Sequence, residues 1–191
     1  MARLPIRIFV DPVLRERALE VTDFDDALRR LADDMLETMR AAAGAGLAGN
    51  QVGVLRRLFT YEWIAERGGE GQFGALVNPE VVETSEELQE GEEGCLSFPG
   101  LFYPTERPLR ARVRAQDVHG EPLELTGEGM LARIFLHEID HLNGILFIDH
   151  LARHDRKAAM RRIREGELEH PTREPGEAAP PLHVASPSET G

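Results

Sequence analysis

The sequence predicts one domain that combines α-helices with β-strands, and three observations lead to this fold class. Apolar residues recur at helical spacing in residues 22–43 and again in residues 128–142. Residues 109–118 instead alternate apolar and polar side chains, as a half-buried strand does. The 191 residues with 41% hydrophobic content can build one core but leave little room for a second full domain.

The composition limits the partners and the compartment. With 34 acidic against 22 basic residues, the net charge of −12 argues against a general nucleic-acid-binding protein, DNA-binding proteins included, and against a protein that binds anionic membranes. No apolar run approaches the roughly 18 residues that cross a bilayer, and Met1–Val10 lacks the apolar core of a signal peptide. Cys95 is the single cysteine, which suits a reducing compartment. We therefore expect a cytoplasmic protein with no membrane partner.

The first elements are a short strand and a long helix. Ile6–Val10 reads as a strand that ends at Asp11-Pro12, where proline removes a backbone donor. A helix is predicted over Thr22–Ala43, because Thr22-x-x-Asp25 resembles a capping box. An apolar stripe follows along this helix and predicts a core face rather than a cofactor site: Phe24, Leu28, Leu31, Met35 and Met39.

A glycine-rich segment follows, Gly44-Ala45-Gly46-Leu47-Ala48-Gly49-Asn50-Gln51. Three glycines in eight residues allow positive φ angles or a close approach of the backbone to another group. Gln51 adds an amide that can donate a hydrogen bond to an oxyanion. A glycine cap at the helix end followed by a loop explains Gly44 and Gly46 equally well, so both interpretations stay open.

Two strands are predicted next, at Arg57–Tyr61 and Ala75–Val77, bounded by the turn-rich Arg67-Gly68-Gly69 and by Asn78-Pro79. The acidic run Glu83–Glu93 is typical of a solvated loop.

This run ends at Glu93-Gly94-Cys95-Leu96-Ser97, where a thiol follows a glycine and precedes a backbone that can present an N–H group. A lone cysteine is also common as a small buried hydrophobe.

A hairpin is predicted from the alternation in Leu109–Val118. Its alternate arginines lie on the solvated face, and His119-Gly120 turns the chain into a return strand that contains Leu123 and Leu125.

The candidate metal-binding residues lie in a helix that is predicted over Glu128–Leu142. Its wide apolar surface indicates that the helix is buried, and Asn143-Gly144 marks its C-terminal end. His137 and His141 are four residues apart, so both imidazoles lie on one face of this helix, with Glu138 beside them. Neutral histidine binds Zn²⁺ or Fe²⁺, and a carboxylate beside such an ion can accept a proton from water. The pattern predicts a mononuclear metal site.

A catalytic site of this type needs a third protein ligand. The metalloprotease pattern His-Glu-x-x-His-x-x-Gly-x-x-His fails because Phe147 stands at its third histidine. Glu165 and Glu167 lie at the edge of a tail that cannot hold a ligand rigidly. Cys95 is the remaining candidate, since thiolate is a strong ligand for both ions. A metallopeptidase stays open as a rival, and so does a non-catalytic module with a fourth ligand from His119, His150 or His154.

The chain closes with a basic helix and a polar tail. A helix is predicted over Asp155–Arg164, and residues 166–191 have the composition of a disordered segment. A basic cluster surrounds the single Asp155: Arg153, Arg156, Lys157, Arg161, Arg162 and Arg164. Two interpretations stay open for it, a solvated helix end or a patch that docks on ribosomal RNA.

The glycine-rich segment, Glu93–Ser97 and His137–His141 together resemble the three signature segments of the peptide deformylase family, in the same order and with similar spacing. The resemblance spans roughly residues 5 to 165. Two departures stand out. Gly49 replaces the usual alanine, which is expected to loosen that loop, and Ala41–Ala43 lacks an acidic residue that some members carry.

The resemblance implies an α+β fold, with antiparallel strands packed around a central metal-binding helix, a C-terminal helix and a disordered tail. Residues 1–165 would form the catalytic domain and residues 166–191 the tail. The implied activity removes the N-formyl group from the N-terminal methionine of newly synthesised proteins, releasing formate, so N-formylmethionyl nascent polypeptides are the expected partners. The implied native ion is Fe²⁺, with Zn²⁺, Ni²⁺ or Co²⁺ able to replace it.

The family roles carry over position by position. Cys95, His137 and His141 would hold the metal. Glu138 would take a proton from the attacking water and return it to the leaving amine. The Gln51 amide and the Leu96 N–H, with the metal, would stabilise the developing oxyanion. The groove for the peptide would be lined by the backbone around Gly46 and Gly94, with Glu93 nearby, whereas Asp140 would make a structural contact.

Overall fold

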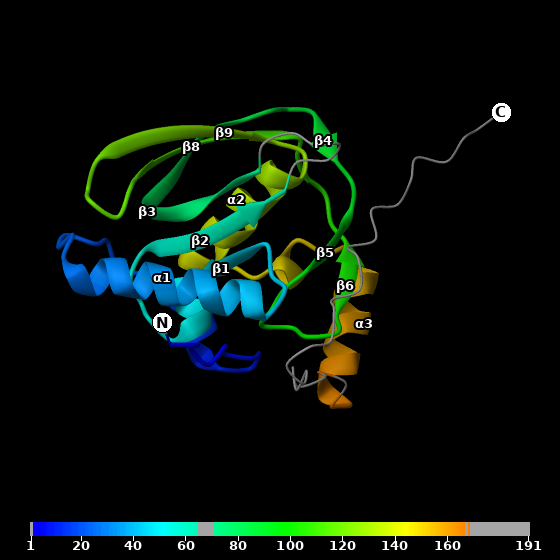
Figure 1. Ribbon diagram of the computed structural model, residues 1–191. Helices are drawn as coiled ribbons and strands as arrows, with labels where there is room; N and C mark the ends of the chain where they lie inside the picture. The colour runs from blue at the N-terminus through cyan, green and yellow to red at the C-terminus, as the bar shows by residue number, and fades with distance from the viewer. Residues whose placement is uncertain (1, 65–70, 167, 169–191) are drawn as a thin grey trace.

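The fold is organised around α2, Met130–Leu142, which runs through the middle of the molecule in Figure 1. The computed structural model describes residues 2–64, 71–166 and 168. In this part of the chain three α-helices are combined with antiparallel strands, so the predicted α+β fold is confirmed. The prediction for the tail falls almost entirely on residues outside this description.

A five-stranded antiparallel sheet has the order β1-β2-β3-β8-β9. Its strands are β1 Gly46–Ala48, β2 Leu58–Trp63, β3 Gln72–Thr84, β8 Arg110–Gln116 and β9 Pro122–Glu128. The predicted hairpin is the pair β8 and β9, in which Val113 is opposite Leu125. The remaining described strands form two short antiparallel pairs. β4 Leu88–Gln89 pairs with β7 Arg107–Pro108, and β5 Glu92–Gly94 pairs with β6 Phe102–Pro104.

The sheet packs on α2 through aromatic side chains. The Phe135 ring of α2 lies 5.2 Å from the Tyr61 ring and 6.2 Å from the Phe59 ring, centre to centre. Both partners belong to β2, and all three side chains are buried. Because burial of apolar surface is the main force that holds the helix, these contacts fix the position of α2 and of the residues His137–His141 that it carries.

The first long helix, α1, spans Asp26–Ala41 and begins four residues later than predicted. Its N-cap is Asp25, whose side chain accepts a hydrogen bond from the Leu28 N–H at 2.8 Å. Thr22 is therefore outside the helix, and the proposed capping box is wrong because the aspartate itself is the cap. Leu28, Met35 and Met39 are fully buried, so the predicted core stripe is confirmed for these positions.

The predicted strand at Ile6–Val10 is wrong. The Arg7 N–H donates to the Gln51 carbonyl at 2.7 Å, and the Phe9 N–H donates to the Ser97 carbonyl at 2.9 Å. These bonds reach two different segments of the chain, so no ladder with a single partner strand forms. The proline at 12 instead starts a 3₁₀-helix, η1 Pro12–Arg15.

Two further predictions around β3 are corrected. β3 does not end at Asn78-Pro79, since it passes through these residues with a shift in register between Val77 and Glu80. Asn78 absorbs the irregularity with a φ of 51°, as expected for a β-bulge. The acidic run Glu83–Glu93 is not a solvated loop, because it contributes to β3, β4 and β5 and ends at the buried Glu93.

The last helix, α3, spans Arg153–Arg164 and begins two residues earlier than predicted. It lies at the lower right edge of the molecule in Figure 1, next to β6. Ala159 is its buried contact with the core, while most of its basic side chains are exposed. No helix in residues 2–64 or 71–166 is long and apolar enough to span a bilayer.

Candidate active site

Two turns of α2 present the predicted histidines to each other. The Nε2 atoms of His137 and His141 are 3.2 Å apart, and both side chains are buried. At this distance the two facing Nε2 atoms cannot both carry a proton. Burial and the neighbouring His137 hold the pKa of His141 well below its ordinary value. Burial acts in the same direction on His137, but its hydrogen-bond partners Cys95 and Glu93 outweigh burial and raise its pKa well above the ordinary value.

The thiol of Cys95 reaches the same point from the end of β5. Its Sγ lies 3.2 Å from the Nε2 of His141. The segment after Cys95 folds back, because the Phe98 N–H donates to the Cys95 carbonyl at 2.8 Å. The Ser97 N–H also donates to Sγ at 3.4 Å, which holds the sulfur in place.

The donor set suits a transition metal ion. One sulfur and two imidazole nitrogens lie within 4.8 Å of one another. Zn²⁺ and Fe²⁺ both bind such a set, in which the thiolate is a soft ligand and the imidazoles are of borderline softness. In the part of the chain that the structure describes, this cluster contains no fourth protein ligand. His119, His150, His154 and Glu165 lie outside it, and Glu167 is outside the described residues. A three-ligand set leaves room for water or substrate.

Behind His137 lies a buried charge network that was not predicted from the sequence. The Nδ1 of His137 is 2.6 Å from Glu93 Oε1, which leaves Nε2 for a metal. Arg107 donates to both oxygens of Glu93, at 2.6 and 3.0 Å, and Arg133 donates to Oε2 at 2.9 Å. Although burial opposes the charge, the bonds from His137 and Arg107 hold the Glu93 pKa well below its usual range.

One signal for this network was available in the sequence. Arg133 interrupts the apolar stretch of α2, and a buried arginine needs an acidic or carbonyl partner. The sequence contains no comparable signal that Arg107 is buried or that the Glu93 side chain points inward. Asp140 accepts from Arg107 at 2.6 Å and lies 2.8 Å from the Nε2 of His150, in keeping with the structural contact expected for it.

Glu138 is buried beside the two histidines. Its Oε2 has no hydrogen-bond partner among the described residues, and burial raises the pKa of this carboxyl to about 7. A carboxylate of this kind is a stronger base than a solvated one, because water no longer stabilises its charge.

Gly46 of β1 makes room for this carboxylate. A Cβ at position 46 would lie 2.3 Å from Glu138 Oε1, so a side chain at this position would displace the base. The predicted close approach of the glycine-rich segment to another group is therefore confirmed at Gly46, where that group is the Glu138 carboxylate. The glycine cap is wrong, because the left-handed residue that follows the C-cap Ala42 is Ala43, with a φ of 54°.

We expect Gly46→Ala to lower activity on the order of 10²-fold, since displacement of a reacting group by about 1 Å can cost that much. The measurement is initial rate beside circular dichroism. Gly74→Ala is the matched control, because a Cβ there would have a single neighbour at 3.8 Å, an ordinary contact. Equal rates for the two variants would contradict the close approach of Gly46 to Glu138.

Gln51 lies in η2, Gly49–Val52, and its orientation is determined by hydrogen bonds. Its Oε1 accepts from the Ala48 N–H at 2.8 Å. The Nε2 therefore points the other way, 3.5 Å from Cys95 Sγ and 3.2 Å from Ser97 Oγ. This amide group is directed toward the cluster, where it can donate to an oxyanion.

Two glycines shape the surroundings of Gln51. A Cβ on Gly44 would lie 2.6 Å from Leu96 Cδ1, so Leu96 packs directly on this glycine. A Cβ on Gly49 would lie 2.7 Å from the carbonyl oxygens of Val54 and Arg56. These backbone oxygens take the space that a side chain at position 49 would fill, and the expected loosening by Gly49 stays a prediction.

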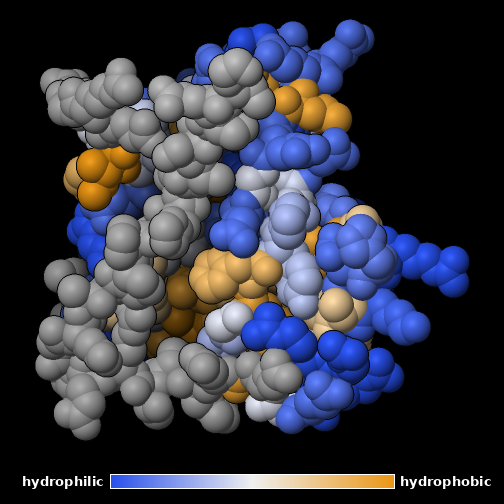
Figure 2. All heavy atoms as spheres, turned by 90° about the vertical axis from the view of Figure 1, so that its right-hand side faces the viewer, coloured by the Kyte–Doolittle hydropathy of each residue, from blue (hydrophilic) through white to orange (hydrophobic). Residues whose placement is uncertain are grey.

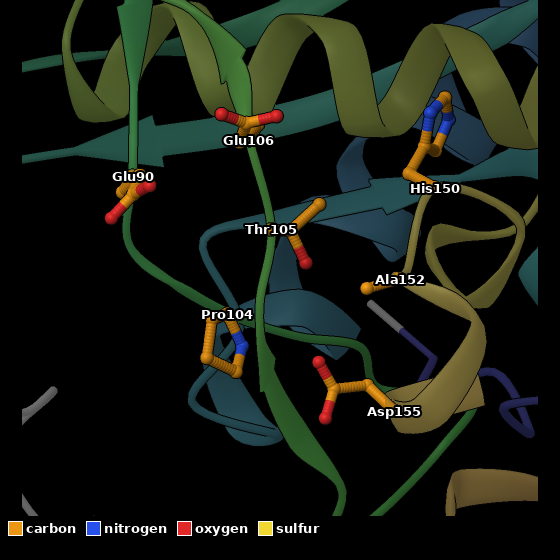
Figure 3. Close-up of a pocket in the computed structure, with 7 residues that line it drawn as sticks. All are labelled: Glu90, Pro104, Thr105, Glu106, His150, Ala152 and Asp155. Carbon is orange, nitrogen blue, oxygen red and sulfur yellow. The ribbon is translucent and has the colours of Figure 1, made fainter. Parts of the chain in front are cut away.

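A separate cavity of about 310 Å³ lies near the surface beside β6 and the start of α3. Figure 3 shows its lining residues, which come from the segment before β5, from the β6 and β7 region and from residues 150–155. None of the three clustered residues lines this cavity. It is therefore distinct from the Cys95, His137 and His141 cluster.

Comparison with known proteins agrees with this geometry. A family model described as polypeptide deformylase matches residues 3–157. The chain is 52% identical to a peptide deformylase of Acidothermus cellulolyticus, over 87% of this chain and 89% of that one. It is 47% identical to peptide deformylase 1 of Corynebacterium glutamicum, over 86% and 96%. A crystal structure of peptide deformylase from Ehrlichia chaffeensis in complex with actinonin superimposes with a TM-score of 0.81 at 38% identity, covering 88% of this chain and all of the other.

Proposed function

This chain belongs to the peptide deformylase family, and from this premise we propose how its residues carry out the reaction. Members of the family are hydrolases that depend on a metal, and this chain removes the N-formyl group from the N-terminal methionine of newly synthesised proteins, releasing formate. The mechanism is supported by one arrangement above all, the buried Glu138 beside the cluster of Cys95, His137 and His141.

Cys95, His137 and His141 would hold the metal ion. When bound, a divalent ion supplies Lewis acidity, which lowers the pKa of a coordinated water and polarises a carbonyl group. Glu93 orients His137 by accepting its Nδ1–H, and the two arginines keep Glu93 ionised. The Ser97 N–H donates a hydrogen bond to the Cys95 sulfur and orients it.

Glu138 is the proposed general base and acid. Its buried carboxylate takes a proton from the attacking water and later gives it to the amine of the methionine, which leaves as a free N-terminus. As the formyl carbon becomes tetrahedral, its oxygen becomes negative. The Gln51 amide and the Leu96 N–H are the proposed donors to this oxygen.

The peptide groove is assigned to the two glycine-containing strands β1 and β5, with the backbone of Gly46 and Gly94 as its walls. Glu93 belongs to the same strand as Gly94, but its carboxylate is taken up by Arg107, Arg133 and His137. Its contribution to the groove would therefore come through its backbone. We assign the catalytic domain to residues 1–165.

The direct test is formate release from a formyl-Met-Ala-Ser peptide beside cleavage of unblocked Met-Ala-Ser, with metal content measured on the same sample. A deformylase releases formate and leaves the unblocked peptide intact. Cleavage of the unblocked peptide would favour a metallopeptidase, the rival with the same helix and glutamate.

We propose Fe²⁺ as the ion in the cell, with Zn²⁺, Ni²⁺ or Co²⁺ able to occupy the same donors. A ferrous site with a thiolate ligand is sensitive to oxidation of the iron or of Cys95. Activity of anaerobically purified protein should therefore decay in air, and replacement of the ion by Ni²⁺ should give lasting activity. Equal decay of the Fe²⁺ and Ni²⁺ forms would count against iron.

We further propose that α3 docks on ribosomal RNA near the emerging chain, in the cytoplasm. Five basic side chains of this helix are exposed: Arg153, Arg156, Lys157, Arg161 and Arg164. Figure 2 shows strongly hydrophilic side chains gathered at the lower right of the face that carries α3. In a protein of net charge −12, such a concentrated basic patch is the part that phosphates would attract.

Reversal of Lys157, Arg161 and Arg164 to glutamate should abolish co-sedimentation with ribosomes, and salt should weaken the wild-type association steeply. Formate release from a short peptide should stay the same, because these exposed side chains do not belong to the ligand cluster. Reversal of Arg112 and Arg114 on β8 is the matched control. Co-sedimentation that survives the α3 changes would exclude this docking.

A further inference from the structure

His150 lies at the outer end of the buried charge network behind His137. It directly follows the 3₁₀-helix η4, Phe147–Asp149, and 36% of its side chain is accessible. Figure 3 shows its ring pointing away from Ala152 and toward α2, at the edge of the cavity described above. Histidines of intermediate exposure are common in proteins, so exposure alone assigns no role to His150.

The contacts of the His150 ring are more informative. Its Nε2 lies 2.8 Å from Asp140 Oδ2, the oxygen that also accepts from Arg107 Nη1 at 2.6 Å. A carboxylate so close to a guanidinium is ionised and can only accept hydrogen bonds. The His150 Nε2 therefore carries the proton of this contact and donates it to Asp140. Asp140 Oδ2 is thus held by two donors, which themselves lie 3.3 Å apart.

Asp140 in turn fixes the orientation of the Arg107 guanidinium. The Nε and Nη2 atoms of Arg107 donate to Glu93, at 3.0 and 2.6 Å. Two parallel hydrogen bonds hold a planar guanidinium at one edge and still allow its plane to rotate about that edge. The bond from Nη1 to Asp140 is a third anchor, which prevents this rotation.

The same contacts extend to a proposed metal ligand. Glu93 Oε1 lies 2.6 Å from the Nδ1 of His137. The partner of a ligating imidazole determines the tautomer and the direction of the ring. A continuous path of side-chain contacts therefore leads from His150 through Asp140, Arg107 and Glu93 to His137.

We propose that His150 is a positioning residue for the metal centre, which acts by donating a hydrogen bond to Asp140 and so holds Arg107 and Glu93 in the arrangement that orients His137. This inference rests on the ligand set proposed above. A role in packing alone leads to a different expectation, because any side chain of similar size at position 150 would then serve equally well.

Two substitutions separate these possibilities. His150→Leu keeps an apolar side chain of comparable size but removes the donor. His150→Gln presents an amide N–H at a similar distance along the side chain and can restore the hydrogen bond to Asp140. The full-length metal-free proteins are titrated with Co²⁺ in competition with a chelator. The dissociation constant is measured together with the visible absorption spectrum of the bound ion, which reports its coordination geometry.

Loss of a group that directly holds a metal ligand typically lowers metal affinity 10- to 100-fold, so for the more distant His150 we expect roughly 3- to 10-fold weaker Co²⁺ binding in His150→Leu. The spectrum of this variant should also change. His150→Gln should bind Co²⁺ with the affinity and the spectrum of the wild type. His154→Leu is the matched control, because the His154 side chain is 82% exposed and its partner is Asp155, outside the network. It should also behave like the wild type.

The outcomes separate this inference from the proposed function. Wild-type affinity and spectrum in His150→Leu would overturn the role of His150. Equal losses in His150→Leu and His150→Gln would show that packing matters rather than the hydrogen bond, and would also overturn it. Failure of the wild type to bind Co²⁺ would overturn the ligand set and the role of His150 together. Absence of formate release by the Co²⁺-loaded wild type would overturn the function, while the comparison of affinities would still decide the role of His150.

Discussion

Replacement of Glu138 by glutamine is expected to lower formate release ~10²- to 10⁴-fold, the usual contribution of a general base. Glutamine has nearly the same shape and fits the buried site beside Gly46, but it cannot accept a proton. The three proposed ligands are untouched, so the metal content should equal that of the wild type. The measurement is kcat for formate release beside elemental analysis of the same preparation.

Glu128→Gln is the matched control, because Glu128 lies just before α2 and its side chain is 66% exposed. It should retain the wild-type rate. Near-normal turnover in metal-replete Glu138→Gln would remove Glu138 from the mechanism, whatever the control does.

Replacement of Cys95 by alanine is expected to release the metal and abolish activity. The change removes one of three protein ligands, and the two histidines alone form a weaker site. If the third ligand instead lay elsewhere in the chain, the same change would only trim a half-buried side chain, at a cost of about 1 kcal/mol in the free energy of unfolding. Elemental analysis and thermal unfolding, performed on the same preparation, distinguish the two cases.

His119→Ala serves as the control for this experiment. His119 is an exposed residue in the turn between β8 and β9, outside the ligand cluster, so its loss should change neither metal content nor rate. Full metal occupancy in Cys95→Ala would mean that the third ligand has been assigned wrongly.

Helices, strands and the faces on which their residues lie could be predicted where a short stretch of sequence determines them. The spacing of His137 and His141 places them on one helix face whatever surrounds the helix, because 3.6 residues per turn bring positions four apart together. The alternation in β8 likewise predicted both the strand and its buried face. The apolar stripe of α1 held for the same reason, although the cap at Asp25 displaced the predicted start.

Predictions failed where backbone groups find partners far along the chain. Residues 6–10 have a plausible strand composition, but their donors bond to Gln51 and Ser97, which come close only in the folded protein. The acidic run 83–93 has a solvated composition, yet its last glutamate is buried because Arg107 and Arg133 compensate its charge. Composition cannot indicate such compensation, since it depends on residues 14 and 40 positions away.

By itself the sequence determined the helix that carries two imidazoles and a carboxylate, the hairpin, and the chemical types available to the site. Only the tertiary structure decided that Cys95 lies 3.2 Å from His141, that Gln51 directs its amide toward the thiol, and that Phe102 covers Gly94. The physical reason is that helix and strand periodicity follow from local backbone geometry, whereas these contacts depend on packing between distant segments around α2.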